Sequence, residues 1–516
     1  MADGGSAFGV LDWAVVFAYL IGMLAIGWWS GRRVKDTTGY QTASGRMGSV
    51  LVGLSLLGAY LSALTMMALP GKAFGGDDWL WAVQLPFLIV TAVVITRFVL
   101  PWYRAAGVVS VYQFLEQRIH VVARVLASLC FLALSTGRAG LTLYLPALAF
   151  SEITKTDITY SIAIMGLVTI AYCVYGGIEA VIWTDAIQVV IFALGALLSV
   201  AYILWGTSLA HGDFLGLAAQ YHKFRMWEPS TNLTQLTTWW LVLQTLFETI
   251  RIYGTQQDMT QRYVATASTR EANQSVWISI LGYIPLGFMF YFIGAALFIY
   301  YQAVGPEAIE GLKNDAIYPH FIATTLPFGV RGLVLAAIFA AAMSTISAIM
   351  NSGATVCVED FYKRFWVKDR PDSHYLWVIR ALTVLSGLAA MGMAVVFWQL
   401  GKDAQDMWSM VMSFTTTGVL ALMALAFLPI RIRPAAAVIG WLTSAVAIWY
   451  LTKRTDVHFL LYPVIGNALG FVVGLLAQTV IVGLQGRTLL SPEERFPLAQ
   501  TSQAAAEATA GNSDPQ

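Results

Sequence analysis

Residues 333–352 read LVLAAIFAAAMSTISAIMNS. This run of about 20 mostly apolar residues is long enough to cross a bilayer as a helix, yet it carries a hydroxyl cluster, Ser344, Thr345 and Ser347. Ala341, Ser344 and Thr345 are spaced i, i+3 and i+4, so one carbonyl and two hydroxyls share a helix face. The stretch therefore predicts a membrane-spanning helix with an oxygen-rich face that suits a small hard cation such as sodium.

The composition of the whole chain points the same way. Hydrophobic residues make up 58% of the 516 residues and charged residues 11%, and the mean hydropathy is +0.67. A soluble domain of this length would not sustain these values, so we expect an all-α polytopic membrane protein. The net charge of +1 argues against nucleic-acid binding. The cysteines Cys130, Cys173 and Cys357 show no metal-binding spacing.

Apolar segments long enough to span a membrane number about thirteen by the usual criterion of length and hydropathy. They cover residues 11–29, 47–69, 79–101, 122–150, 158–176, 179–205, 236–254, 276–301, 329–352, 375–400, 406–429, 434–452 and 459–485. Lys and Arg are about twice as frequent on the side that holds the loops after odd-numbered segments as on the other side. The positive-inside rule then predicts a plasma (inner) membrane protein with its N-terminus outside and its C-terminus in the cytoplasm.

The chain divides into two parts of different composition. Residues 1–488 hold every predicted span and form one transmembrane domain, whose core we place at 47–429. Residues 489–516 are rich in Ala, Ser, Gln and Thr, which predicts a disordered cytoplasmic tail.

Two of the spans carry features of broken helices. The second is interrupted by Ser55, Ser62 and Thr65, although small residues suit close helix packing equally well. The seventh is polar and runs into the sequence GTQQ at 254–257. Interrupted spans at corresponding positions in two halves indicate a transporter binding site. A five-helix unit crosses the membrane an odd number of times, so a second copy that follows it has the opposite orientation. Such an inverted repeat would pair helices 2–6 with helices 7–11.

Two charged residues lie deep inside apolar segments. A guanidinium at the depth of Arg138 has to face a partner, a water-filled cavity or a ligand, because burying its charge alone is costly. Asp185 in turn needs a cation, a hydrogen-bond donor or a proton. Structural alternatives are an ion pair between Arg138 and an intramembrane carboxylate such as Glu248, and a hydrogen bond at Asp185.

Three motifs in order along the chain carry a family resemblance. They are YGGIEAVIWTDAIQ at 175–188, QQDMTQRY at 256–263 and AAAMSTIS…NS at 340–352. With them, residues 49–433 resemble the sodium:solute symporter family, whose members share the LeuT fold with its inverted repeats. The resemblance implies a LeuT-type 5+5 repeat in which helices 2 and 7 are broken.

The same resemblance implies where sodium binds. The carbonyls of Gly58, Leu61 and Ala341 and the hydroxyls of Ser344 and Thr345 would form the common site. The alternative is that these hydroxyls only bond back to carbonyls of their own helix.

A second sodium site is implied for some family members. It would use Asp185 with Ser344 and Ser347, although Ala348 stands where bacterial sialic acid transporters offer another hydroxyl. One or two sodium ions per cycle therefore both remain open.

A further motif indicates how the solute is bound. Residues 137–149, GRAGLTLYLPALA, resemble a run in the bacterial sialic acid transporters whose arginine binds the substrate carboxylate. A guanidinium fork suits two carboxylate oxygens, so Arg138 is the expected anchor. Ser62, Thr65 and Gln84 match polar substrate contacts, whereas Tyr60 replaces a smaller hydroxyl residue. We expect a sialic acid-like or other organic anion; the alternative is a neutral sugar or amino acid.

Together these features predict sodium-coupled symport of a small organic solute by alternating access. The expected partners are the solute, sodium as the coupling ion and the lipid bilayer, with no cofactor, no nucleic acid and no obligate protein partner. A channel is the rival class. An enzyme is disfavoured because the sequence holds neither a His-Glu-x-x-His nor a Gly-x-Ser-x-Gly motif.

Overall fold

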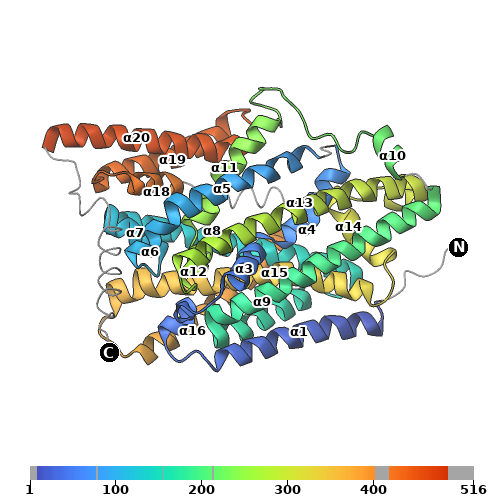
Figure 1. Cartoon of the computed structure of the whole chain (residues 1–516), viewed down its shortest axis with the longest axis horizontal. Coiled ribbons are helices and arrows are strands. Elements are labelled where there is room, and N and C mark those ends of the chain that lie inside the picture. The colour runs from blue at the N-terminus through green and yellow to red at the C-terminus, as the bar shows by residue number, and fades with distance from the viewer. Residues whose placement is uncertain (1–7, 77–78, 155, 212–213, 401–417, 486–516) are drawn as a thin grey trace, which may run out of the picture.

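The computed structural model describes residues 8–76, 79–154, 156–211, 214–400 and 418–485, which form a bundle of long helices (Figure 1). Within these residues, strand-type pairing is limited to an isolated bridge between Met47 and Thr266. Nine of the described helices are long and apolar enough to cross a membrane, or ten if one bent pair counts as a single span. The predicted all-α polytopic class is therefore confirmed, whereas the count of about thirteen spans stays a prediction.

The helices follow one another along the chain. They are α1 (Val10–Gly31), α2 (Thr37–Thr42), η1 (Ala43–Gly45), α3 (Ser49–Tyr60), α4 (Ala63–Phe74), η2 (Leu80–Phe87), α5 (Leu88–Val94), η3 (Ile95–Val99), α6 (Leu100–Ala106), α7 (Val111–Arg118), α8 (Val121–Thr154), α9 (Ile158–His211), α10 (Phe214–Gln220), α11 (Thr238–Thr255), α12 (Gln257–Val264), α13 (Thr269–Val304), η4 (Pro306–Ile309), α14 (Asn314–Thr324), α15 (Val330–Val356), η5 (Cys357–Trp366), α16 (Asp372–Leu400), α18 (Val419–Phe427), α19 (Pro434–Arg454), η6 (Phe459–Leu461) and α20 (Tyr462–Gln485).

The helix α9 contains two predicted spans joined at a kink. At Gly177 the backbone adopts φ 56° and ψ −149°. A Cβ atom there would lie 2.7 Å from the carbonyl oxygen of Tyr40, so both the positive φ and the close approach require glycine. The kink falls between the segments 158–176 and 179–205 that the sequence separates.

The second span is broken, as the sequence suggests. Helix α3 ends at Tyr60, Leu61 and Ser62 adopt extended backbone, and α4 begins at Ala63. The two helices meet at a bend of 57°. Extended residues inside a span leave backbone carbonyls without helical partners, and such groups can serve as ligands.

The seventh span is continuous, and a break follows at its end. Helix α11 ends at Thr255, Gln256 is extended with φ −91° and ψ 135°, and α12 starts at Gln257. Both expected breaks are thus present. The symmetry that would relate helices 2–6 to helices 7–11 stays a prediction.

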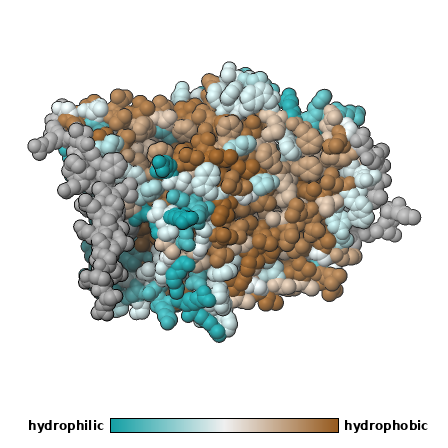
Figure 2. Space-filling view, viewed as in Figure 1, coloured by the Kyte–Doolittle hydropathy of each residue, from teal (hydrophilic) through white to brown (hydrophobic). Residues whose placement is uncertain are grey.

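Helix α15 lies inside the bundle, with α1 on one side and α19 and α20 on the opposite side (Figure 1). Of its most apolar 18 residues, 94% are buried, compared with 28% for α19. Apolar residues dominate much of the face shown in Figure 2, whereas hydrophilic ones gather toward the left. The hydroxyls of α15 therefore face other helices rather than lipid.

Two predictions fall wholly or partly on residues outside those described. The predicted span 406–429 is described only from residue 418, where α18 (Val419–Phe427) continues it. The predicted tail 489–516 lies outside the described residues.

Candidate functional site

A cluster of oxygen atoms forms where the break in the second span meets α15. The Ser344 hydroxyl donates to the Gly58 carbonyl at 2.9 Å. The Thr345 hydroxyl donates to the Leu61 carbonyl at 3.1 Å. Both hydroxyls also reach the Ala341 carbonyl, at 3.2 and 3.3 Å. All five residues predicted for the common sodium site are thus brought together; we call them the break cluster.

The break cluster combines the two alternatives left open by the sequence. The hydroxyls of Ser344 and Thr345 do bond back to the carbonyl of Ala341, but they also bond across to α3 and the break that follows it. Both residues are 1% exposed. Three carbonyls and two hydroxyls supply oxygens without a charge of their own, which is a ligand set that suits a small hard cation. A cation bound there would replace the hydroxyl hydrogens as the partner of these carbonyls.

A second polar cluster surrounds Asp185, and it contains a cation of its own. One carboxylate oxygen, Oδ2, accepts from Arg262 Nη2 at 2.7 Å and from the Ser55 hydroxyl at 2.6 Å. Arg262 Nε also donates to Ser55, at 2.7 Å. Asp185 and Arg262 are both fully buried. The charge of Asp185 is therefore neutralised by a residue of α12; we call these three residues the ion-pair cluster.

The pairing of Arg262 and Ser55 with Asp185 does not follow from the sequence reasoning. The signal in the sequence is that Arg262 belongs to the motif 256–263, which begins at the expected helix break. A buried aspartate requires a compensating group, but one sequence does not show which of several arginines reaches it.

The other oxygen of Asp185 points to the residues of the predicted second sodium site. Oδ1 lies 3.5 Å from the Ser347 hydroxyl. That hydroxyl donates to the Ser344 carbonyl at 2.9 Å. The three predicted residues are thus neighbours, with Oδ1 less tightly held than Oδ2.

Arg138 reaches the broken helix. Its Nη2 donates to the Ala59 carbonyl at 3.0 Å, and its Nη1 lies 3.8 Å from Asp258 Oδ2. Glu248, the partner named as the structural alternative, instead binds Arg251 with two hydrogen bonds of 2.8 and 2.6 Å. The carboxylate beside Arg138 is therefore Asp258, which the sequence reasoning does not single out.

Tyr60, at the end of α3, packs against aromatic rings of two other helices. Its ring centroid lies 4.7 Å from that of Tyr283 and 5.6 Å from that of Tyr253. In the break itself, the Ser62 amide donates to the Thr65 hydroxyl at 3.3 Å. Tyr60, Ser62 and Thr65 thus lie at or beside the break.

Gln84 of η2 faces the same two helices as Tyr60. It accepts from the Thr245 hydroxyl of α11 at 2.5 Å and donates to the Tyr291 hydroxyl of α13 at 3.3 Å. Thr245 and Tyr253 lie about two turns apart on α11, a rise of about 12 Å at 1.5 Å per residue. Gln84 is therefore displaced along the bundle from the residues of the break.

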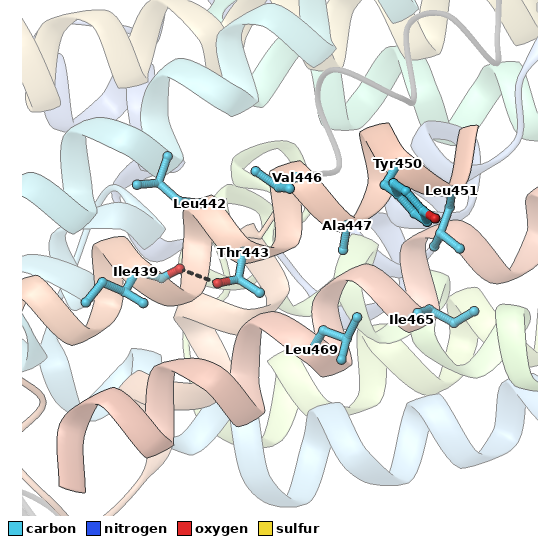
Figure 3. Close-up of a pocket in the computed structure, with 9 residues that line it drawn as sticks. All are labelled: Ile439, Leu442, Thr443, Val446, Ala447, Tyr450, Leu451, Ile465 and Leu469. Atoms are coloured by element: carbon cyan, nitrogen blue, oxygen red, sulfur yellow. Dashed lines mark hydrogen bonds between the residues drawn. The ribbon is translucent and has the colours of Figure 1, made fainter. Parts of the chain in front are cut away.

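A groove of about 520 Å³ lies elsewhere, along α19 and α20 (Figure 3). It is lined by Ile439, Leu442, Thr443, Val446, Ala447, Tyr450, Leu451, Ile465 and Leu469. The Thr443 hydroxyl donates to the Ile439 carbonyl of its own helix at 2.8 Å. This apolar lining on outer helices suits lipid tails rather than an ion or a polar solute.

Comparison with known proteins gives a consistent result. The model of the Sodium:solute symporter family matches residues 40–444. The sodium/sialic acid symporter SiaT of Proteus mirabilis is 30% identical over 95% of this chain and 97% of its own. The sodium-coupled monocarboxylate transporter 1 of Mus musculus is 28% identical over 89% of this chain and 75% of its own.

A solved structure extends the likeness to three dimensions. It is described as a substrate-bound outward-open state of a Na+-coupled sialic acid symporter that reveals a novel Na+ site. The two chains superpose with a TM-score of 0.84 at 30% identity, over 92% of this chain and 98% of the other.

Proposed function

This chain belongs to the sodium:solute symporter family, and we propose that it uses sodium entry at the break cluster to drive uptake of a carboxylate-bearing solute held by Arg138. The resemblance drawn from the three motifs is confirmed by the family match. Membership in a family of transporters shows a sodium symporter rather than an enzyme or a channel, so sodium is the coupling ion.

The proposed sodium site and the proposed solute anchor, Arg138, contact the same short stretch of backbone, and this observation carries the proposal. The carbonyls of Gly58 and Leu61 belong to the break cluster, while the carbonyl of Ala59 between them accepts from Arg138. An ion and a solute at these positions act on the same four residues. Because binding is linked reciprocally, sodium that fixes the break raises the affinity for the solute, and the solute raises the affinity for sodium.

We propose that a second sodium ion binds at Asp185. Oδ2 is held by Arg262 and Ser55, whereas Oδ1 has a longer contact of 3.5 Å, to the Ser347 hydroxyl, and would be the oxygen that binds the ion. The solved relative with a novel Na+ site supports two sites. One sodium with a monoanion is electroneutral, whereas two are electrogenic and gain about 2.3 kcal/mol per 100 mV for the additional charge.

Among carboxylates, the separate positions of Arg138 and Gln84 along the bundle favour a long solute. Arg138 binds next to Tyr60, whereas Gln84 contacts α11 about 12 Å farther along its axis. A solute that contacts both residues has to be elongated, as a sialic acid-like sugar acid is. Ser62, Thr65 and Tyr60 would contact it near the break.

We also propose a membrane, an orientation and domain boundaries for this transporter. We place the transporter in the plasma (inner) membrane with the N-terminus outside, because basic residues are more frequent in the loops of the opposite side. The symporter domain covers 1–488 with its core at 47–429, followed by a cytoplasmic tail at 489–516. The lipid bilayer is its surrounding partner, and the proposal requires no obligate protein partner.

The proposal is tested by uptake of labelled solutes into proteoliposomes, with and without an inward sodium gradient. We expect sodium-driven uptake of a carboxylate solute in the wild type and its loss in Arg138→Ala. Loss of one charge-assisted contact of about 1.5–3 kcal/mol weakens binding roughly 10- to 100-fold.

Arg138→Lys is the matched control, because lysine keeps the charge but loses the planar fork. It should retain uptake with weakened affinity. Sodium-driven uptake of a neutral solute that survives in Arg138→Ala would contradict the carboxylate assignment and leave symport intact.

A further inference from the structure

Asp258 is a buried carboxylate with an unused oxygen. It is 2% exposed, and within the described part of the chain its Oδ1 has no hydrogen-bond partner. Its Oδ2 lies 3.8 Å from Arg138 Nη1, beyond hydrogen-bond distance. A buried acceptor without a donor is costly, so the group is incomplete as it stands.

The nearby arginines are committed to other acceptors. Arg262 binds Asp185, Ser55 and the backbone carbonyl of Asp258 itself. Arg251 forms two hydrogen bonds with Glu248. Among the described residues, the carboxylate of Asp258 is therefore left with a loose contact to Arg138 as its charge partner.

A simple counter-ion role explains this geometry poorly. Charge-assisted hydrogen bonds between guanidinium and carboxylate close to about 2.7–2.9 Å when nothing intervenes. The pair Arg262–Asp185 does so at 2.7 Å, whereas Arg138–Asp258 stays at 3.8 Å. Arg138 is bonded to the Ala59 carbonyl on broken helix α3, and Asp258 is the second residue of α12, directly after the other break. The two charged groups thus lie beside the two breaks, where Arg138 is the expected anchor of the solute.

We propose that Asp258 is a second substrate-binding residue, which accepts a hydrogen bond from a hydroxyl or ammonium group next to the solute carboxylate. This inference rests on the proposed function, in which Arg138 binds that carboxylate. A 2-hydroxy or 2-amino acid carries a carboxylate acceptor and a hydroxyl or ammonium donor on adjacent carbons. Such a ligand can pair with Arg138 and Asp258 at the same time. A plain carboxylate pairs with Arg138 but offers no donor to Asp258.

A binding role for Asp258 would select one class of substrate, carboxylates with an adjacent hydrogen-bond donor. A site whose buried polar group is left unpaired by an analogue discriminates strongly against that analogue. We expect a preference of about tenfold or more for a carboxylate with an adjacent donor over the same carboxylate without it.

The test compares matched solutes in proteoliposomes that contain the full-length protein. The small set is propionate, lactate and alanine, which differ in the group on carbon 2; the large pair is N-acetylneuraminate and its 2-deoxy analogue. Half-saturation constants for sodium-dependent uptake are measured for wild type, Asp258→Ala and Asp258→Asn. The ratio within a matched set is independent of how much protein is active.

We expect the donor-bearing member of at least one set to be preferred by about tenfold in the wild type and the ratio to approach one in Asp258→Ala. An ammonium ligand loses its preference in Asp258→Asn, whereas a hydroxyl ligand keeps part of it because the amide oxygen still accepts.

Wild-type ratios near one in both sets overturn the inference without any variant. A wild-type preference that persists in Asp258→Ala shows a counter-ion only and overturns it as well. Uptake of plain and donor-bearing carboxylates alike leaves the proposed function standing, whereas sodium-driven uptake of no carboxylate overturns both.

Discussion

The break cluster and the ion-pair cluster lie a turn apart on α3 but use opposite chemistry. In the break cluster, uncharged oxygens of Gly58, Leu61 and α15 converge, and the two hydroxyls donate to the three carbonyls. In the ion-pair cluster, Asp185 already has a cation, Arg262, at 2.7 Å. The first arrangement offers ligands to an ion from outside, whereas the second is largely complete within the chain.

The contrast predicts different behaviour during transport: an ion can enter and leave the neutral cluster, whereas the chain itself compensates the charge of Asp185. A neutral site binds a cation without leaving a buried charge behind when the cation leaves, so it can empty and refill. A buried carboxylate cannot be left alone at comparable cost. Arg262 keeps Asp185 compensated whether or not an ion lies at Oδ1.

Removal of the built-in cation is expected to have the largest effect. Arg262→Met leaves Asp185 buried without its partner, and we expect a loss of about 3–5 kcal/mol in the free energy of unfolding. Thermal unfolding of purified protein in detergent measures this as a lowered midpoint.

Two variants control that experiment. Arg364→Met removes an arginine whose ion pair with Glu116 is 41% exposed on the arginine side, so it should cost less than about 1 kcal/mol. The double variant Arg262→Met with Asp185→Asn should recover much of the stability. Equal midpoints for wild type and Arg262→Met would show that the ion pair does not compensate Asp185.

The break cluster is tested by removing one hydroxyl. Thr345→Val deletes the oxygen that reaches the Leu61 carbonyl and keeps the side-chain volume. We expect the half-saturation concentration for sodium to rise about tenfold or more, since a lost ligand contact of about 1.4 kcal/mol corresponds to a factor of ten. Sodium titration of solute uptake measures it.

The matched control is Thr169→Val. That buried hydroxyl of α9 donates to the Met165 carbonyl of its own helix at 2.7 Å, so its loss should leave the sodium dependence unchanged. A Thr345→Val protein with wild-type sodium dependence would place the coupling ion elsewhere.

The smallest expected effect concerns the boundary between the two clusters. Ser347→Ala removes the hydroxyl beside Asp185 Oδ1 but leaves Arg262 and the break cluster in place. We expect uptake to persist while the Hill coefficient for sodium falls from about two to about one, because one of two linked sites is lost. Current and flux measured together report the stoichiometry. A coefficient that is one in both proteins would mean a single sodium ion.

Much of the site follows from short stretches of the sequence. The spacing of Ala341, Ser344 and Thr345 puts three candidate ligand oxygens on one helix face, and the polar residues that precede Pro70 mark the break that offers the others. These features are local, because helical periodicity and helix interruption depend on a short stretch of chain. Arg138 and Asp185 are likewise recognisable as residues that need partners, since charge is costly inside a membrane wherever it occurs.

The identity of those partners depends on tertiary packing. Asp185 lies on α9, Ser55 on α3 and Arg262 on α12. Arg138 on α8 faces Asp258 on α12 rather than Glu248 on α11. Such pairings depend on how helices distant in sequence rotate and pack, which no periodicity within one segment encodes.

A membrane-spanning bundle with polar breaks and a need for charge compensation is thus a property of the sequence, because hydropathy and helix interruption are local. The distinction between a neutral cluster and an ion-paired one is a property of the packing of α3, α9, α12 and α15. The same packing, together with α8, leaves one carboxylate oxygen of Asp258 without a hydrogen-bond donor among the residues that the structure describes.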